Sequence, residues 1–182
     1  MRRIFLYTLL VFPVVSILSC KPQPQKEVKR NIILDVDVSV DDMMTILYFL
    51  ACPDIDIKAI TIESGVSCVD SGAAIVHRLL KMSGRTEIPV ASGTGIPIAG
   101  NNSFPKEWQP PVDSPFGLEL PEYAPEASAP DAVSLIAQLA GTYKDNITIL
   151  ALGPMTNIAR VFINNSALAE NIDQIYVSDG AV

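Results

Sequence analysis

Four aspartates within eight residues are the part of this sequence best suited to chemistry. Asp35, Asp37, Asp41 and Asp42 all lie in the stretch NIILDVDVSVDDMMTILYFL, residues 31–50. Carboxylates only a few ångströms apart repel one another strongly where the effective dielectric is low. A hard divalent cation held by oxygen ligands would offset that repulsion, and calcium and magnesium are the candidates. The cluster therefore indicates a metal site; a capped helix with incidental surface acids is the simpler alternative.

The elements on either side explain why these acids come together. Residues 32–34, Ile-Ile-Leu, form a short apolar run that is typical of a buried parallel strand. After Asp42, apolar residues recur at helical spacing: Met43, Met44, Ile46, Leu47 and Leu50. We expect Asp35 and Asp37 on one face of the strand and Ser39 as the N-cap of the helix. The acids thus belong to a turn at the carboxyl end of a strand, where open α/β sheets bind ligands.

The rest of the chain alternates strands with helices. Strands are expected at 55–62, 88–91, 147–152 and 172–177, and helices at 71–83, 131–143 and 156–169. Strands separated by helices predict a parallel sheet with right-handed crossovers. The predicted fold class is therefore α/β, a Rossmann-like open, mostly parallel sheet with flanking helices. The segment 92–129 is rich in Gly, Pro and Asn, and we expect it to be functional or disordered.

The acidic stretch resembles a known family. DVDVSVDD after an apolar strand is similar to the DxDxxxDD signature of the inosine-uridine-preferring nucleoside hydrolases. Three later stretches also resemble segments of that family: TEIPV at 86–90, FPKEW at 104–108 and LALGPMTNIA at 150–159. A DxD pair alone also occurs in haloacid-dehalogenase-type phosphatases, but such a phosphatase does not need Asp41 and Asp42. The resemblance covers residues 31–182, and because such domains are longer, we expect the C-terminal part of the domain to be missing.

The resemblance implies an enzyme that hydrolyses the N-glycosidic bond of small-molecule ribonucleosides, releasing the base from the ribose, with one calcium ion. It implies that Asp37, Asp42 and the main-chain carbonyl of Leu152 are ligands of that ion. It further implies that Asp41 takes a proton from the attacking water, and that Asp35 supports the metal ligands from behind them.

Some positions depart from the family pattern. Val66 stands where the family has an Asn, or in one branch a Glu, that binds ribose, and a valine side chain cannot bind a hydroxyl. Glu63 or Ser67 could compensate for it. Ser178 replaces a Met that touches the sugar, and Asp179 adds a carboxylate. An inactive calcium-binding or ligand-binding relic of the same fold therefore stays open beside the enzyme.

Other residues with chemical potential have structural interpretations. His77, the only histidine, lies inside a predicted helix away from any strand end, which indicates a solvent-facing or capping role. Trp108 either stacks on a ligand ring or, with Phe104, pins the long segment to the core. Cys52 and Cys68 neither demand nor exclude a disulfide.

The first thirty residues are expected to lie outside the fold. Residues 1–20 have a basic start and a short apolar run, as in a secretory signal peptide, and Ile-Leu-Ser-Cys20 resembles a bacterial lipobox with Cys20 lipidated. An ordinary secretory signal is the alternative. Residues 21–30 are predicted to be a polar tether, which leaves 31–182 as the nucleoside hydrolase-like domain. The predicted location is the cell envelope, with the lipid anchor as the only membrane contact.

Charge excludes one class of partner. From Asn31 onward the chain has seven basic against nineteen acidic residues, a net charge of −12. An acidic domain without a basic stripe argues against nucleic-acid polymers and suits a cation and a small neutral substrate. A complete protein of this kind could form a homo-oligomer.

Overall fold

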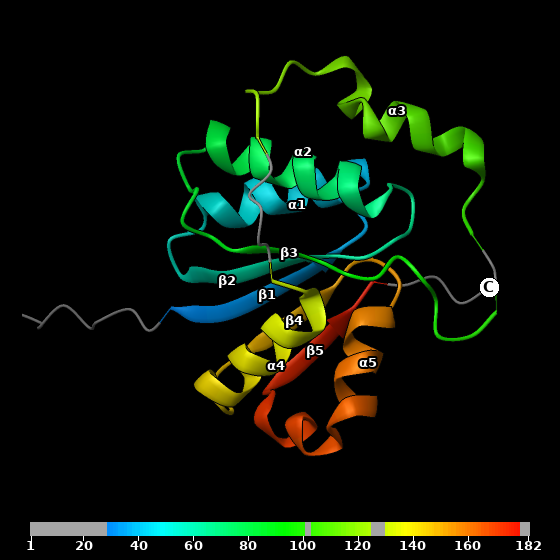
Figure 1. Ribbon diagram of the computed structural model, residues 1–182. Helices are drawn as coiled ribbons and strands as arrows, with labels where there is room; N and C mark the ends of the chain where they lie inside the picture. Colours follow the sequence, from blue (N-terminus) through cyan, green and yellow to red (C-terminus); the bar gives the residue numbers. More distant parts are fainter. Residues whose placement is uncertain (1–28, 101–102, 125–129, 179–182) are drawn as a thin grey trace, which may run out of the picture.

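Five parallel strands form one sheet between two layers of helices (Figure 1). The computed structural model describes residues 29–100, 103–124 and 130–178, so that Cys20 and Asp179 lie outside the described residues. The strands are β1 (Arg30–Val36), β2 (Ile55–Ile62), β3 (Val90–Ser92), β4 (Thr148–Ala151) and β5 (Gln174–Val177). Helices α1 (Val40–Ala51) and α2 (Val69–Met82) cover one face, and α4 (Ala132–Tyr143) and α5 (Thr156–Asn164) cover the other. The predicted parallel α/β sheet is confirmed.

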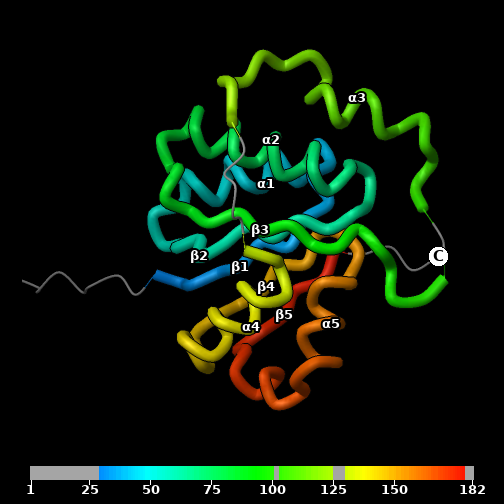
Figure 2. The backbone as a smooth tube through the Cα atoms, in the orientation of Figure 1, coloured from blue at the N-terminus to red at the C-terminus, as the bar shows by residue number. Residues whose placement is uncertain are grey.

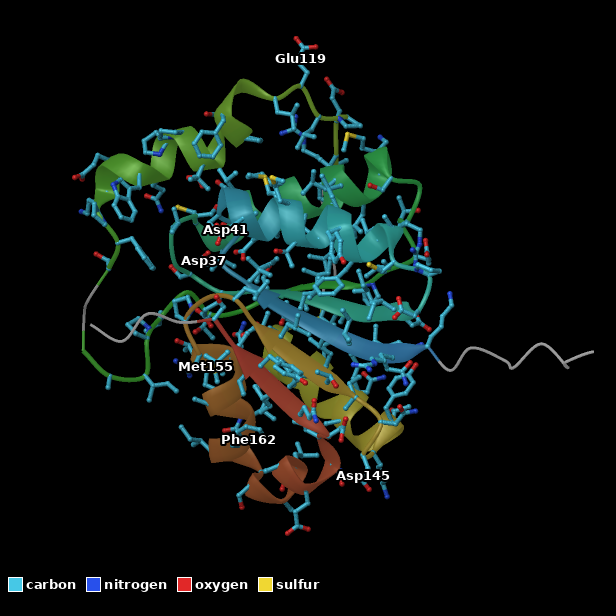
Figure 3. The ribbon with its side chains drawn as sticks, turned by 180° about the vertical axis from the view of Figure 1, so that it is seen from behind. Asp37, Asp41, Glu119, Asp145, Met155 and Phe162 are labelled. Atoms are coloured by element: carbon cyan, nitrogen blue, oxygen red, sulfur yellow. The ribbon has the colours of Figure 1, made fainter. Side chains whose placement is uncertain are left out.

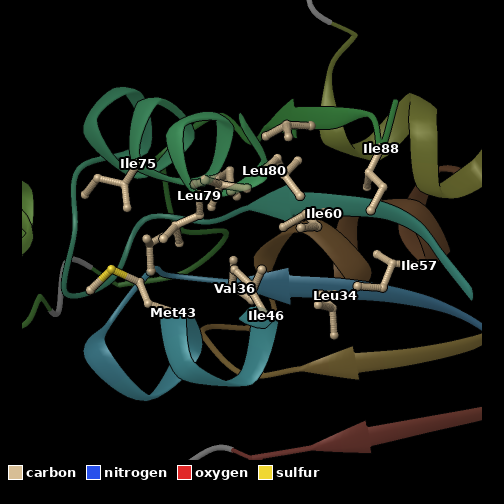
Figure 4. Close-up of a cluster of buried hydrophobic side chains, with 14 of the residues drawn as sticks. Leu34, Val36, Met43, Ile46, Ile57, Ile60, Ile75, Leu79, Leu80 and Ile88 are labelled. Carbon is tan, nitrogen blue, oxygen red and sulfur yellow. The ribbon is translucent and has the colours of Figure 1, made fainter. Parts of the chain in front are cut away.

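Each face of the sheet has its own hydrophobic core. Along β1, Ile32, Leu34 and Val36 pack under α1 and α2, while Ile33 packs against α4 and α5. Side chains alternate along a strand, and apolar residues point to both sides of β1 because helices cover both faces of the sheet. Figure 4 shows the first core, where Ile46 of α1 and Leu79 of α2 meet the strand residues. The sheet centre is therefore rigidly packed, and β1 lies in its middle.

The strand order β3-β2-β1-β4-β5 determines where a ligand site can lie. The chain moves outward from β1 through β2 to β3, then returns to the other side of β1 for β4 and β5, as the tube in Figure 2 shows. The direction of winding therefore reverses between β1 and β4. In open α/β sheets the crevice at such a switch point, outside the carboxyl ends of the strands, is where ligands bind.

Several expected boundaries differ from the observed ones by one to five residues. Strand β1 ends at Val36, so Asp37 lies in the turn after the strand and does not share a strand face with Asp35. Helix α2 starts at Val69 rather than residue 71. Helix α5 ends at Asn164, five residues early, because Asn165 is extended and its side chain accepts the N–H of Ala167, which starts the 3-10 helix η3 (Ser166–Asn171).

The long connection between β3 and α4 contains short helices. They are η1 (Lys106–Trp108), α3 (Gln109–Asp113) and η2 (Pro115–Gly117), and they lie over the layer that α1 and α2 form (Figure 1). Val112 and Leu120 are buried and anchor the connection. Phe104 and Trp108 contact each other but are 41% and 51% exposed, so they do not pin it to the core. No helix within the described part of the chain is long and apolar enough to cross a membrane.

Candidate active site

Asp37 lies at the switch point, between two loops. The loop after β2 donates two hydrogen bonds to it: Val66 N–H to the carboxylate Oδ2 at 3.0 Å and Ser67 N–H to the main-chain oxygen at 3.2 Å. The turn after β4 contacts it from the other side, since a Cβ placed on Gly153 would be 3.0 Å from the Asp37 nitrogen and Cβ. Asp37 is only 4% exposed, so its carboxylate is fixed in place before any ligand binds.

Asp42 lies beside Asp37, at the start of α1. Its Oδ2 accepts the backbone N–H groups of Asp37 at 3.1 Å and Ser39 at 3.2 Å. Ser39 is the N-cap, as predicted, and forms a capping box with Asp42. Burial, together with the Asp37 carboxylate, raises the pKa of Asp42 to about 8. The pair therefore disfavours a second negative charge and favours either a bound proton or a cation.

Asp41 points a different way from its neighbours. It is exposed, and its carboxylate accepts the hydroxyl of Ser39. Figure 3 shows Asp37 and Asp41 near each other at the end of the sheet where α1 begins. Of the four acids of the cluster, Asp41 is thus the one whose carboxylate is exposed to solvent.

Asp35 is held by hydrogen bonds beneath the turn. Thr61 of β2 donates to Oδ1 at 2.5 Å, and the amide of Asn157 in α5 donates to the same oxygen at 2.9 Å. The Asn157 amide also donates to the carbonyl of Ile62 at 3.2 Å, so it ties β1, β2 and α5 together. Burial raises the pKa of Asp35 to about 7, and the bonds from Asn157 and Thr61 oppose that shift. This carboxyl group, at 1% exposed, is too deep to reach a substrate directly.

The turn that separates Asp35 and Asp37 from Asp41 and Asp42 is strained. Val38 has φ +61°, a left-handed conformation that is uncommon for a β-branched residue, and its side chain is fully buried. Such strain costs on the order of 1–3 kcal/mol and persists only where the surroundings impose it. It lets the chain reverse within three residues, so that the Asp42 carboxylate reaches back to the N–H of Asp37.

Comparison with known proteins identifies the family of this chain. Residues 32–182 match the family described as inosine-uridine preferring nucleoside hydrolase. The chain belongs to that family. It is 34% identical over 154 residues to the pyrimidine-specific ribonucleoside hydrolase RihA of Escherichia coli O127:H6, covering 83% of this chain and 48% of that relative. It is 32% identical over 155 residues to RihA of Photobacterium profundum, covering 84% and 49%.

Solved structures of other nucleoside hydrolases share the fold. A purine-preferring ribonucleoside hydrolase from Gardnerella vaginalis superposes with a TM-score of 0.74 at 25% identity, over 84% of this chain and 49% of the other. The plant nucleoside hydrolase PpNRh1 superposes with a TM-score of 0.72 at 27% identity, over 84% and 48%. This nucleoside hydrolase chain therefore spans about half the length of the relatives it matches.

The residues at this turn fit part of a site for a hard divalent cation. Asp37 and Asp42 are buried side by side, and neither forms an ion pair with any described Lys or Arg. Carboxylate oxygens suit calcium, and they need positive charge nearby. Within residues 29–100, 103–124 and 130–178, however, no three His, Cys, Asp or Glu side chains are placed to share one ion. Further ligands would have to be main-chain oxygens, such as that of Leu152, whose N–H donates to the main-chain oxygen of Asp35 at 2.8 Å, or water, or groups outside these ranges.

Several site residues have no signal of their own in the sequence. Asn157 falls within a matching motif, but its bond to Asp35 spans 122 positions. The backbone of Val66, rather than its side chain, contacts the site. Gly65 packs so closely that a Cβ there would lie 2.0 Å from Asp37 Oδ2.

The remaining candidates lie elsewhere. His77 stacks on Tyr123 with ring centroids 4.1 Å apart, away from the acids, in agreement with a structural role. Cys52 and Cys68 are both free thiols. Neither the histidine nor a disulfide contributes to the site.

Proposed function

We propose that the protein hydrolyses the N-glycosidic bond of ribonucleosides, releasing a base and ribose, in a calcium-dependent reaction. Membership of the nucleoside hydrolase family and the ribonucleoside hydrolases among the relatives support this activity. Because the chain spans about half the length of those relatives, the activity is proposed for the whole protein.

One observation carries the proposal: two buried carboxylates and one exposed carboxylate meet at the topological switch point of a parallel sheet. Asp37 and Asp42, with the main-chain oxygen of Leu152, would hold the ion. A bound calcium ion would supply the positive charge that two adjacent carboxylates require and would polarise water. Asp41, being exposed, would take the proton from the attacking water as it approaches the anomeric carbon. Asp35 would keep the turn in position through Thr61 and Asn157.

Substitutions of the two adjacent acids separate metal binding from catalysis. We expect Asp42→Asn to abolish calcium binding in calorimetry, because it removes a ligand charge. We expect Asp41→Asn to leave the calcium affinity within a fewfold and to lower kcat for uridine or inosine by roughly 10²–10⁴-fold, the usual contribution of a general base. Base release is measured by liquid chromatography, with and without a chelator.

Asp54→Asn is the matched control, because Asp54 is exposed at the opposite, amino edge of the sheet and should change neither quantity. Equal loss of affinity and rate in Asp41→Asn would contradict the assignment of the base. If the whole protein bound calcium but hydrolysed no nucleoside, it would be a non-catalytic binding protein and the proposed activity would be wrong.

We further propose that the protein is exported and anchored by a lipid on Cys20. The basic start, the short apolar run and the lipobox-like residues before Cys20 support this location. Cys20→Ser should move the protein from the membrane fraction of expressing bacteria to the soluble fraction, with Cys52→Ser as the control. Retention of the Cys20→Ser protein in the membrane fraction would argue for a different anchor.

A further inference from the structure

Helix α2 begins without a side-chain cap of its own. Its N-cap residue is Cys68, whose side chain makes no capping hydrogen bond, although α2 is fourteen residues long and its first N–H groups need acceptors. For the first of these N–H groups, that of Cys68, the acceptor lies more than forty residues further along the chain. Oδ1 of Asp113, at the end of α3, accepts the N–H of Cys68 at 3.3 Å. A carboxylate there also benefits from the positive end of the helix dipole.

Asp113 makes its shorter contact with Ser67. The Ser67 hydroxyl, which is buried, lies 2.7 Å from Asp113 Oδ1 and 3.1 Å from the carbonyl of Cys68. A hydroxyl has one proton to donate, and the carboxylate is the closer and stronger acceptor. Gln109 of α3 reaches the same turn, donating to the Cys68 sulfur at 2.9 Å. Helix α3 is therefore attached to the start of α2 by two of its polar side chains.

Ser67 also connects this contact to the acidic cluster. Its backbone N–H donates to the main-chain oxygen of Asp37 at 3.2 Å, and its own carbonyl accepts the N–H of Gly65 at 3.4 Å. Val66, between Gly65 and Ser67, donates its N–H to the Asp37 carboxylate. One short loop, residues 65–67, thus has Asp113 on its outer side and Asp37 on its inner side.

We propose that Asp113 is a positioning residue for the candidate active site: by holding Ser67 from outside, it keeps the Val66 N–H directed at the Asp37 carboxylate. Its importance for turnover rests on the proposed function, but the positioning itself does not. Without Asp113, the Ser67 hydroxyl and the Cys68 N–H lose their charged acceptor, and loop 65–67 opens more often. Helix α3 of the β3–α4 connection thereby acts on the site through loop 65–67.

Amide hydrogen exchange of the full chain, resolved by residue with NMR and recorded without calcium or substrate, tests this. We expect Asp113→Ala to speed exchange of the Val66 and Ser67 amides about tenfold, while the amide of Ile33 in β1 is unchanged. Asp113→Asn keeps an acceptor oxygen and should restore most of the protection. Glu119→Ala is the control, because Glu119 is an exposed acid of the same connection and points away from the domain in Figure 3.

Unchanged exchange at Val66 in Asp113→Ala would overturn the proposal. Faster exchange at Ile33 to the same degree would also overturn it, because the residue would then support the whole fold rather than the loop. Ser67→Ala gives a second route if Asp113→Ala does not fold: it should produce the same local increase, and an unchanged Val66 amide there also counts against the proposal. A protein that shows the expected exchange but hydrolyses no nucleoside would contradict the proposed function alone.

Discussion

Asp37 occupies a space that leaves no room for additional atoms on its neighbours. A Cβ on Gly65 would lie 2.0 Å from Oδ2 of Asp37, and a Cβ on Gly153 would lie 3.0 Å from its Cβ. These glycines are needed for the close approach of backbone to a side chain, since neither has a positive φ. The carboxylate is therefore positioned by two loops that are 88 residues apart in the chain.

Replacing one of these glycines should disable the site while sparing the fold. We expect Gly65→Ala to displace the Asp37 carboxylate, to abolish calcium binding in calorimetry and to lower the free energy of unfolding by about 1–3 kcal/mol through overpacking. Gly141→Ala in α4 is the control: nothing lies within 4 Å of its Cβ, so alanine should raise the free energy of unfolding by about 0.5–1 kcal/mol. Wild-type calcium affinity in Gly65→Ala would remove Asp37 from the ligand set.

The helices differ in how their first turns are satisfied. Helix α1 uses Ser39 and Asp42 from its own sequence, whereas α2 takes its acceptor from Asp113 of a distant segment. Helix α4 has a simple local cap, because Asp131 accepts the N–H of Ser134 at 2.9 Å. That hydrogen bond lowers the pKa of Asp131, which favours its charged form in the folded protein.

The cap of α4 should therefore be pH-dependent. At pH 7 we expect Asp131→Ala to lower the free energy of unfolding, measured with urea, by about 1 kcal/mol. Because the pKa of Asp131 is lower when folded than when unfolded, its stabilisation is complete above about pH 5 and is lost as the pH falls through the folded pKa. Asp131→Asn keeps the capping oxygen without the charge and should lack this loss. The same pH dependence in Asp131→Asn as in wild type would assign it to other carboxyl groups.

At the scale of the whole molecule, the long β3–α4 connection is fastened to α2 at a second place. Arg78 donates from Nε to the carbonyl of Pro121 at 3.0 Å and from Nη2 to that of Leu120 at 2.9 Å. Lys81 donates to the carbonyl of Glu122 at 2.8 Å. These contacts bring buried Leu120 into the core beneath α2, so the connection is part of the packed domain.

Removal of the arginine should loosen this connection alone. In Arg78→Ala, the carbonyls of Leu120 and Pro121 lose their donor, and we expect thermolysin or chymotrypsin to cut near residues 118–124 several times faster than in wild type. Arg85→Ala is the control, because the Arg85 side chain pairs with Glu87, an exposed neighbour two positions along the chain. Cleavage that accelerates equally in Arg85→Ala, or an unchanged pattern in Arg78→Ala, would show that other contacts hold the segment.

The sequence by itself determined the type and order of the main elements and the position of the acidic turn. The runs that form β1 and β2 and the helical spacing after Asp42 are local patterns, and burial on both faces follows from their apolar character. The capping role of Ser39 was likewise readable, because it depends on residues within one turn. The early end of α5 was missed, since the extended Asn165 interrupts an otherwise helical pattern.

Only the tertiary structure decided how the acids are held. The left-handed Val38 takes Asp37 out of the strand, Asn157 reaches Asp35 from α5, and Asp113 meets Ser67 across 46 positions. The Asn157 contact depends on the return of the chain from β3 to the other side of β1, and the Asp113 contact depends on the placement of α3 over α1 and α2. Such contacts leave no periodic trace in the residues that make them, because the partner's position is set by the packing of the sheet and helices rather than by neighbours in the chain.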